Sequence, residues 1–372
     1  MTTDTALIEK REELKRRLVA GEYKTLVDIF LEWIDRLIRK FTRRSVPLPT
    51  WYIIIFLTLV YYGSSFLLSY VEGNLENLNR FGDITSTGPL FVLLSGPVLV
   101  ITSMVVINRY IHQIFILWKN DVFDATESIT SLGGFGRWLE LVCNWRLHLL
   151  VTISGGLLGG IYLTTLASNL AGVFMGYWYG FASVFLLLYF YALIYLVLIA
   201  VILSARLRGY EMKLFAADPS SSELISRLSA LLGSMVYFIA VFAAFTTLVA
   251  AIMRLLLPLG MIVVLVLWLP IIILFVLNQT SLSTIIRRAK WKTLNEIQLK
   301  VEKLQTSKNF GNQETMDAIK RLMDYHDRVK ATSDSALDFR TYLGFINSLL
   351  LPLLAFILGN LDLVLNLFTR KP

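Results

Sequence analysis

Neutral polar side chains interrupt several long apolar runs of this sequence, and their types suggest what those runs could do. Hydroxyl and amide groups could line a path for a solute through a membrane, because they exchange hydrogen bonds with it without binding ions tightly. They could instead join neighbouring helices, each such hydrogen bond contributing about 0.6 kcal/mol. The candidates are Tyr61, Tyr62, Ser65, Tyr191, Tyr195, Thr246, Asn278 and Gln279.

The residue patterns of common catalytic and cofactor sites are missing. The apolar runs before residue 280 contain no Asp or Glu, although ion-coupled transporters commonly hold such a carboxylate within the membrane. The sequence has neither a GxxxxGK phosphate-binding loop nor an HExxH zinc pattern. Its three histidines, His112, His148 and His326, are far apart in the chain. We therefore expect no enzymatic activity, no cofactor and no metal ion.

The composition is typical of an integral membrane protein. Of the 372 residues, 56% are hydrophobic and 17% charged, and the mean hydropathy is +0.63. Soluble domains are roughly 45–50% apolar and about 25% charged. The net charge of +8 would suggest nucleic acid as the partner of a soluble protein, but here the positive residues flank apolar runs, so we expect no nucleic-acid partner. The single cysteine excludes an internal disulfide.

Seven apolar runs are long enough to cross a bilayer, because a helix needs about 20 residues to span its hydrocarbon core. The runs are 51–70, 88–108, 147–168, 179–204, 228–253, 259–277 and 343–360. The sequence therefore predicts an all-α, polytopic membrane protein with about seven transmembrane helices. Pro97 and Pro270 should kink two of them. The last run contains Pro352 and either crosses the bilayer or dips in and returns; its length favours crossing.

The positive charges orient these runs. Nearly all of the 35 Lys and Arg residues lie in four alternate connecting segments. These segments are 1–50, 109–146, 205–227 and 280–342. Because cytoplasmic connections are enriched in positive residues, we place the N-terminus in the cytosol and the protein in the plasma membrane. Arg254 lies in an outer connection, where it either snorkels to the surface or attracts anions to an outer pore mouth.

The same features divide the chain into four parts. Residues 1–46 are expected to form cytosolic or interfacial amphipathic helices, and residues 47–287 a bundle of six transmembrane helices. Residues 288–340 are expected to form a cytosolic helical hairpin. Residues 341–372 hold the last membrane segment and a tail.

Segment 24–41 has the spacing of an amphipathic helix. Its large apolar side chains recur every three or four residues and share one face, with charged residues opposite. That face consists of Leu26, Phe30, Trp33, Leu37 and Phe41. The helix either lies on the inner membrane surface or packs on the cytosolic helices of its own chain, and the sequence leaves both open.

Segment 289–331 has the pattern of a helical hairpin. On each side of a turn at 306–313, apolar positions step by three and four residues, as in the seam of a coiled coil. They are Leu294, Ile297, Val301 and Leu304 before the turn, and Ile319, Leu322, His326 and Val329 after it. His326 could sense pH, because histidine titrates near neutrality, or could simply lie at the edge of the hairpin.

Four glycines stand close together in the third apolar run, in the stretch SGGLLGG at 154–160. They make two overlapping GxxxG pairs, and small residues continue one pair at intervals of four. The stripe consists of Gly155, Gly156, Gly159, Gly160, Thr164 and Ser168. Small residues so spaced let another helix approach closely. We expect a span of the same chain or of a neighbouring subunit to pack there; the alternative is that the glycines line a pore.

The last apolar run is preceded by Thr341 and Tyr342 and then five mostly apolar residues. With a cytosolic N-terminus and a large cytosolic helical part, this layout resembles the seven-helix chemoreceptor channels, the insect gustatory and odorant receptors and their relatives. The family pattern continues with Gln-Phe, where this sequence has Ser348 and Leu349. The resemblance implies a tetrameric, ligand-gated cation channel whose seventh span lines the pore.

Three functions fit these observations. The first is a pore or channel that acts as a homo-oligomer in the lipid bilayer and is regulated by the cytosolic hairpin. The second is a membrane sensor or scaffold whose cytosolic helices bind a protein partner. The third is a facilitator for an uncharged or lipid-like substrate.

Overall fold

The structure is a computed structural model, and every regular element in the part that it describes is a helix. It describes residues 3–42, 50–71, 87–171, 177–252, 258–306 and 312–335. The long helices are α1 (Thr3–Val19), α2 (Leu26–Thr42), α3 (Thr50–Val71), α5 (Thr87–Leu117), α7 (Ile129–Val142), α8 (Trp145–Ala171), α9 (Tyr177–Leu207), α10 (Glu223–Ile252), α11 (Pro258–Gln305) and α12 (Gln313–Ala331). Three short helices are η1 (Trp118–Val122), α6 (Phe123–Ala125) and η2 (Pro219–Ser221).

Six of the predicted apolar runs coincide with α3, α5, α8, α9, α10 and α11. Where side chains are described, four helices are long and apolar enough to cross a membrane, and a fifth is added if α7 and α8, which meet at a 47° bend, count as one. The helices α5 and α11 continue through Pro97 and Pro270. The seventh run, 343–360, lies outside the described residues.

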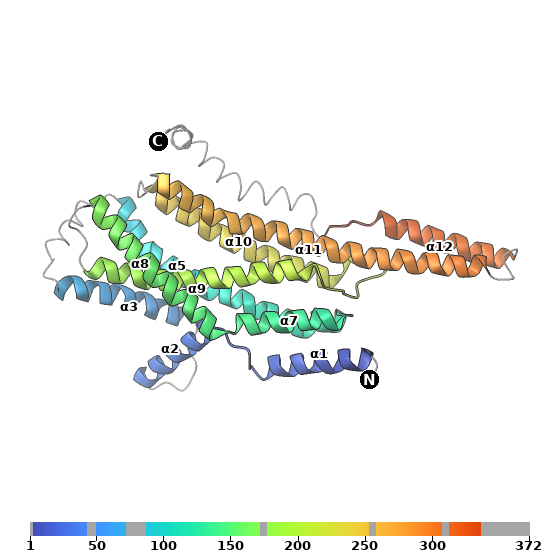
Figure 1. Cartoon of the computed structure of the whole chain (residues 1–372), viewed down its shortest axis with the longest axis horizontal. Coiled ribbons are helices and arrows are strands. Elements are labelled where there is room, and N and C mark those ends of the chain that lie inside the picture. The colour runs from blue at the N-terminus through green and yellow to red at the C-terminus, as the bar shows by residue number, and fades with distance from the viewer. Residues whose placement is uncertain are drawn as a thin grey trace.

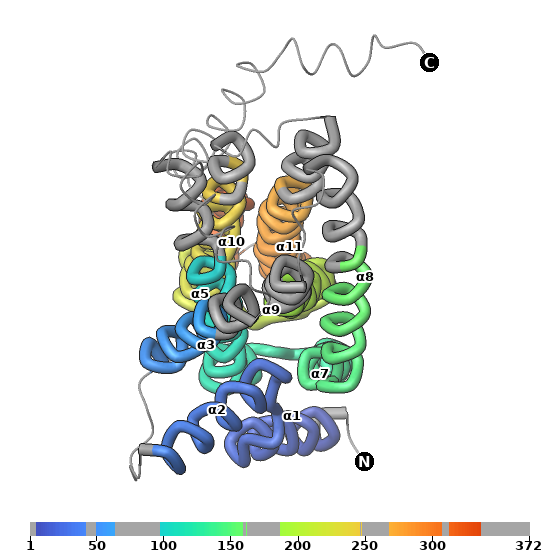
Figure 2. Tube along the Cα trace, turned by 90° about the vertical axis from the view of Figure 1, so that its left-hand side faces the viewer, coloured from blue at the N-terminus to red at the C-terminus, as the bar shows by residue number. Residues whose placement is uncertain are grey.

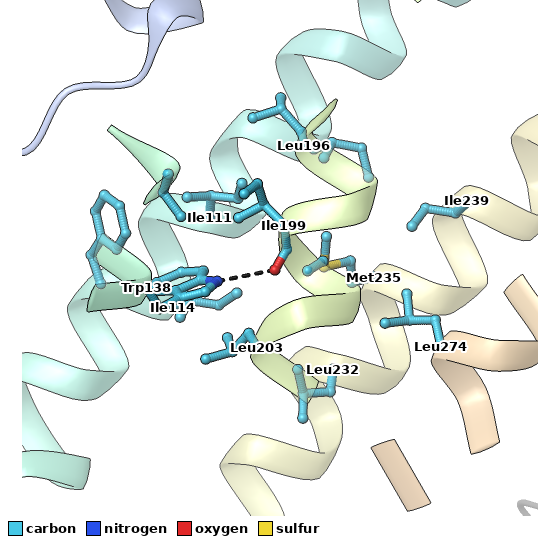
Figure 3. Packing of buried hydrophobic residues seen from close by; sticks show 14 of the residues in the cluster. Ile111, Ile114, Trp138, Leu196, Ile199, Leu203, Leu232, Met235, Ile239 and Leu274 are labelled. Carbon is cyan, nitrogen blue, oxygen red and sulfur yellow. Dashed lines mark hydrogen bonds between the residues drawn. The ribbon is translucent and has the colours of Figure 1, made fainter. Parts of the chain in front are cut away.

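The helix α9 lies inside the bundle, between α5, α8 and α11 (Figure 2). The part of α9 from 179 to 204 contains no charged residue. A helix without a charged face is typical of a buried position. Leu196, Ile199 and Leu203 are buried on α9 against side chains of α5, α7, α10 and α11 (Figure 3). The indole Nε1 of Trp138 on α7 donates to the Ile199 carbonyl at 3.0 Å.

The connections predicted to face the cytosol fold into a helical layer of their own. Its core is aromatic, with Trp118, Phe123, Phe135 and Trp138 fully buried. The rings of Trp118 and Phe135 stack with centroids 5.0 Å apart. Because large aromatic side chains bury much surface each, η1, α6 and α7 are held firmly against the neighbouring ends of the apolar helices.

The helix α11 leaves the bundle and continues into the predicted hairpin. Its 48 residues run without a break, a length of about 72 Å at 1.5 Å per residue. Its far part pairs with α12, and the two helices extend beyond the rest of the molecule (Figure 1). Leu294, Ile297 and Val301 are buried at 3%, 4% and 8% exposure on the predicted seam, and Val329 of α12 is fully buried.

Candidate functional site

The densest group of buried polar contacts joins the start of α2 to α5. Thr25 stands just before α2 and caps it: its Oγ1 accepts from the Asp28 backbone N at 3.1 Å, and Asp28 Oδ2 accepts from the Thr25 backbone N at 2.8 Å. This reciprocal pairing satisfies amide groups that the first turn of a helix leaves without partners. It also points both side chains towards α5.

Asn108 and His112, one turn apart on α5, complete the group. Asn108 Nδ2 donates to Asp28 Oδ1 at 2.7 Å, and His112 Nε2 lies 2.8 Å from the same oxygen. Thr25 Oγ1 donates to Asn108 Oδ1 at 2.7 Å. Thr25 is fully buried and Asn108 is 3% exposed. The four side chains therefore form one closed network, which we call the α2–α5 junction.

The junction favours the ionised forms of its acid and its base. Both residues lie outside the predicted membrane-spanning runs. Burial alone would raise the pKa of Asp28, but hydrogen bonds from His112, Thr25 and Asn108 outweigh it and hold that pKa below its usual value. The hydrogen bond to Asp28 raises the pKa of His112, against the opposite effect of burial. A charge-assisted pair of this kind is stronger than a neutral hydrogen bond.

A cavity of about 350 Å³ opens beside the junction. Its lining includes Tyr23, Lys24, Glu32, His112 and Lys119. The Tyr23 hydroxyl is buried without a hydrogen-bond partner, and Lys24 pairs with Glu32 at 2.6 Å. The cavity thus combines polar and apolar side chains in its lining, and His112 is one of the polar ones.

A second polar contact ties the chain after α12 back to α11. Lys290 on α11 is 7% exposed, and its Nζ donates to the Thr332 carbonyl at 2.7 Å and to Asp334 Oδ1 at 2.9 Å. Ser283 Oγ donates to the Asp334 carbonyl at 2.7 Å. These contacts, which we call the hairpin latch, fix the point from which the chain runs on to its last apolar segment.

Two of the predicted packing glycines lie where α8 touches α9. A Cβ atom at Gly155 would overlap the ring of Tyr191. At Gly156 it would lie 2.6 Å from Leu188 Cδ2 and 3.3 Å from Leu188 Cα. The neighbour is therefore a helix of the same chain. The surroundings of the other stripe residues on α8 are not among those described: Gly159, Gly160, Thr164 and Ser168.

Three of the predicted pore-lining side chains contact neighbouring helices. Tyr195 donates its hydroxyl to the Leu141 carbonyl on α7 at 2.7 Å, and its ring stacks on His148 with centroids 4.2 Å apart. Tyr191 packs on Gly155 of α8. Asn278 on α11 is 2% exposed, and its Nδ2 lies 3.4 Å from the Leu232 carbonyl of α10. At these positions the contacts are those expected of side chains that join helices.

The remaining predicted residues are not brought together. Tyr61 and Tyr62 pair edge to face on α3, with centroids 5.3 Å apart, and Gln279 is half-buried on α11. The His326 side chain is 13% exposed, and its Nδ1 lies 3.2 Å from Asp327 Oδ1 of the same helix. The others lie outside the described residues or side chains: Ser65, Thr246, Arg254, Thr341 and Tyr342.

The helix α2 buries a second apolar side next to the predicted apolar face. Val27 and Ile34 are each 2% exposed and pack into the core, whereas Trp33 and Phe41 of the predicted face are 55% and 80% exposed. The helix contacts α3, α5 and α8, so it packs on its own chain and still presents an apolar stripe outward. Asp28 lies opposite the predicted apolar face, as its spacing indicates, and there it meets Asn108 and His112 of α5.

Comparison with known proteins adds no relative. No protein-family model matches the chain, and no curated protein and no solved structure is similar to it. Among the described residues, no group of three or more His, Cys, Asp or Glu side chains could hold a metal ion. The functional argument therefore depends on the geometry of the chain itself.

Proposed function

We propose that this chain is a seven-span plasma-membrane protein that forms an oligomeric channel, and that its cytosolic hairpin controls the last membrane segment. The observation that carries the proposal is the continuity of α11, which runs from the apolar bundle into the hairpin. A helix without a break transmits a displacement at one end to the other. The hairpin latch then places Lys290 of this helix in direct contact with Asp334, only a few residues before the last apolar run.

The conduction path is proposed to lie between subunits. In the described part of one protomer, Tyr191, Tyr195 and Asn278 are occupied by contacts with neighbouring helices. They are therefore poor candidates for a continuous polar path through a single bundle. The resemblance to the chemoreceptor channels implies that the last apolar segment lines the axis shared by the subunits.

Conductance across a planar bilayer tests this proposal. Purified wild-type chain should conduct, and Lys290→Met should change the open probability without preventing insertion, because it breaks the hairpin latch while leaving α11 intact. Lys300→Met is the matched control, since Lys300 is exposed on the same helix. Single particles should show a ring with a central axis. Wild-type chain that inserts but does not conduct would contradict the channel proposal.

The alternative is a sensor or scaffold that binds a cytosolic protein, and one observation favours it. The hairpin exposes large apolar side chains: Trp291 and Leu299 are each 56% exposed, and Met316 and Met323 are 48% and 40% exposed. Tryptophan and methionine are enriched at protein interfaces, and exposed apolar surface can mark such a site. Leu299→Asp should abolish partner binding under this alternative and leave conductance unchanged.

A further inference from the structure

An apolar cavity of about 230 Å³ lies beneath α2, where α2, α5, α8 and α9 meet. Phe30, Met104, Leu188 and Tyr189 are among the residues that line it, and Thr152 on α8 is the hydroxyl-bearing residue of its α8 wall. No charged side chain is among the described residues of the lining. Leu188 also meets Gly156, so the close contact of α8 with α9 adjoins one wall of the cavity.

Thr152 brings an unsatisfied hydroxyl to this cavity. The residue is 8% exposed, and its Oγ1 is buried without a hydrogen-bond partner. A buried polar group without a partner costs about 1–3 kcal/mol. A bound water is a poor hydrogen-bond partner for Thr152 Oγ1, because a stable buried water needs two to four polar partners and the lining offers few.

Thr152 lies within reach of the lipid headgroup region. It is five residues inside the predicted run 147–168, about 8 Å from the inner end at 1.5 Å per residue. The boundary between hydrocarbon and headgroups, where the hydroxyl and ester groups of lipids sit, lies at the end of such a run, so a lipid hydroxyl that enters the cavity by about this distance meets Thr152. A volume of 230 Å³ exceeds the roughly 150 Å³ of an apolar cavity that binds benzene, so it admits part of a lipid chain.

We infer that this cavity binds a neutral lipid of the inner leaflet, with one lipid hydroxyl hydrogen-bonded to Thr152 Oγ1 and part of the apolar body among Phe30, Met104 and Leu188. The absence of a charged residue from the described lining disfavours a charged headgroup, whose burial without a partner is costly. The first turns of α2 form one wall, so the bound lipid contacts the helix that the α2–α5 junction holds in place. The inference uses the membrane placement of the proposed function, not its conduction.

Photo-crosslinking of the full chain in phosphatidylcholine vesicles tests the inference. Diacylglycerol and phosphatidylcholine carrying the same photoreactive acyl chain are compared, and the labelled peptides are mapped by mass spectrometry. Diacylglycerol should label segments 26–30 and 188–192 several-fold more than phosphatidylcholine does. Thr152→Val should remove most of that excess, because one hydrogen bond corresponds to about three- to ten-fold in binding, and Thr152→Ser should retain it.

A matched control and a cavity-filling variant test whether labelling depends on this cavity and its hydroxyl group. Thr58→Val is the matched control, because Thr58 Oγ1 already donates to the Ile54 carbonyl at 2.8 Å, and it should label like the wild type. Ala192→Leu should fill the cavity and lower labelling by both lipids. Equal labelling by the two lipids in the wild type, an unchanged excess in Thr152→Val, or full labelling in Ala192→Leu would overturn the inference. Flotation of the vesicles reports insertion separately, so a failure of membrane placement is recognised as such.

Discussion

His112 Nε2 on α5 lies 2.8 Å from Asp28 Oδ1 on α2, across 84 positions of sequence. The contact joins an amphipathic helix that precedes the first apolar run to the C-terminal part of a helix in the bundle. Asn108 and Thr25 close the network around the same carboxylate. The position of α2 therefore depends on a half-buried acid, two of whose partners come from a distant helix.

The α2–α5 junction should make the attachment of α2 depend on pH. The pKa of His112 is raised above 6.5, so its contribution is fully present below pH 6.5 and is lost as the pH rises through the raised pKa. The pKa of Asp28 is lowered below 3.8, so on the acid side the contribution is lost only as the pH falls through that lower value. Amide hydrogen exchange of α2, corrected for the intrinsic rate, should show protection that weakens as the pH rises through the raised pKa of His112.

His112→Gln should remove this alkaline dependence. Lys24, Glu32 and Lys119 also face the cavity beside the junction, so their contribution must be separated. Glu32→Gln is the control: its side chain is 49% exposed and pairs with Lys24 at the surface, where ion pairs contribute little. If protection of α2 follows the same pH curve in His112→Gln as in the wild type, the ion pair is not what holds the helix.

The apolar helices could be predicted from sequence because length and hydropathy suffice for them. The six runs match α3, α5, α8, α9, α10 and α11, and the hairpin seam at Leu294, Ile297 and Val301 is buried as predicted. These are local patterns, set by the periods of the helix and by the thickness of the bilayer. Sequence alone could also place close helix packing at the glycines, although not the identity of the partner.

The α2–α5 junction could not be predicted because its signal is not local. The spacing of Thr25 and Asp28 is that of a helix cap, and caps are usually exposed. Nothing in the sequence around His112 shows that Asp28 lies beside it. The spacing marked only one of the two apolar sides of α2: Val27 and Ile34 meet the protein, whereas Trp33 and Phe41 of the predicted face remain outside.

Gly156→Ala should destabilise the packing of α8 on α9 by about 1–3 kcal/mol, the usual effect of overpacking. The added Cβ would meet Leu188 Cα at 3.3 Å, and backbone cannot move aside as a flexible side chain can. Gly233→Ala on α10 is the matched control, since its Cβ would meet nothing within 4 Å, and alanine favours helix by about 1 kcal/mol. Thermal unfolding in detergent measures this: the midpoint temperature of Gly156→Ala should be below that of the wild type, and that of Gly233→Ala should not. Equal midpoints would contradict close packing at Gly156.

Cys143, the single cysteine, should react slowly in the folded protein. It lies outside the predicted spans, and burial raises the pKa of its thiol to about 12. The thiolate is the reactive form, so little of it exists at pH 8. Maleimide labelling at that pH should be slow in the native chain and fast after unfolding in dodecyl sulfate. Rapid native labelling would mean that α7 opens readily at its end.

Epitope tags at Lys213 and Lys308 should be found on the same face of the membrane. Both lie in segments rich in positive residues, and an even number of predicted spans separates them, so the charge rule places both in the cytosol. A tag beside Arg254 should appear on the opposite face, because Arg254 lies between the runs that form α10 and α11. The side on which each tag lies is measured by antibody binding to cells before and after their membrane is permeabilised. Tags at Lys213 and Lys308 on opposite faces would invalidate the assigned spans, and the proposed link between the cytosolic hairpin and the last membrane segment would fail with them.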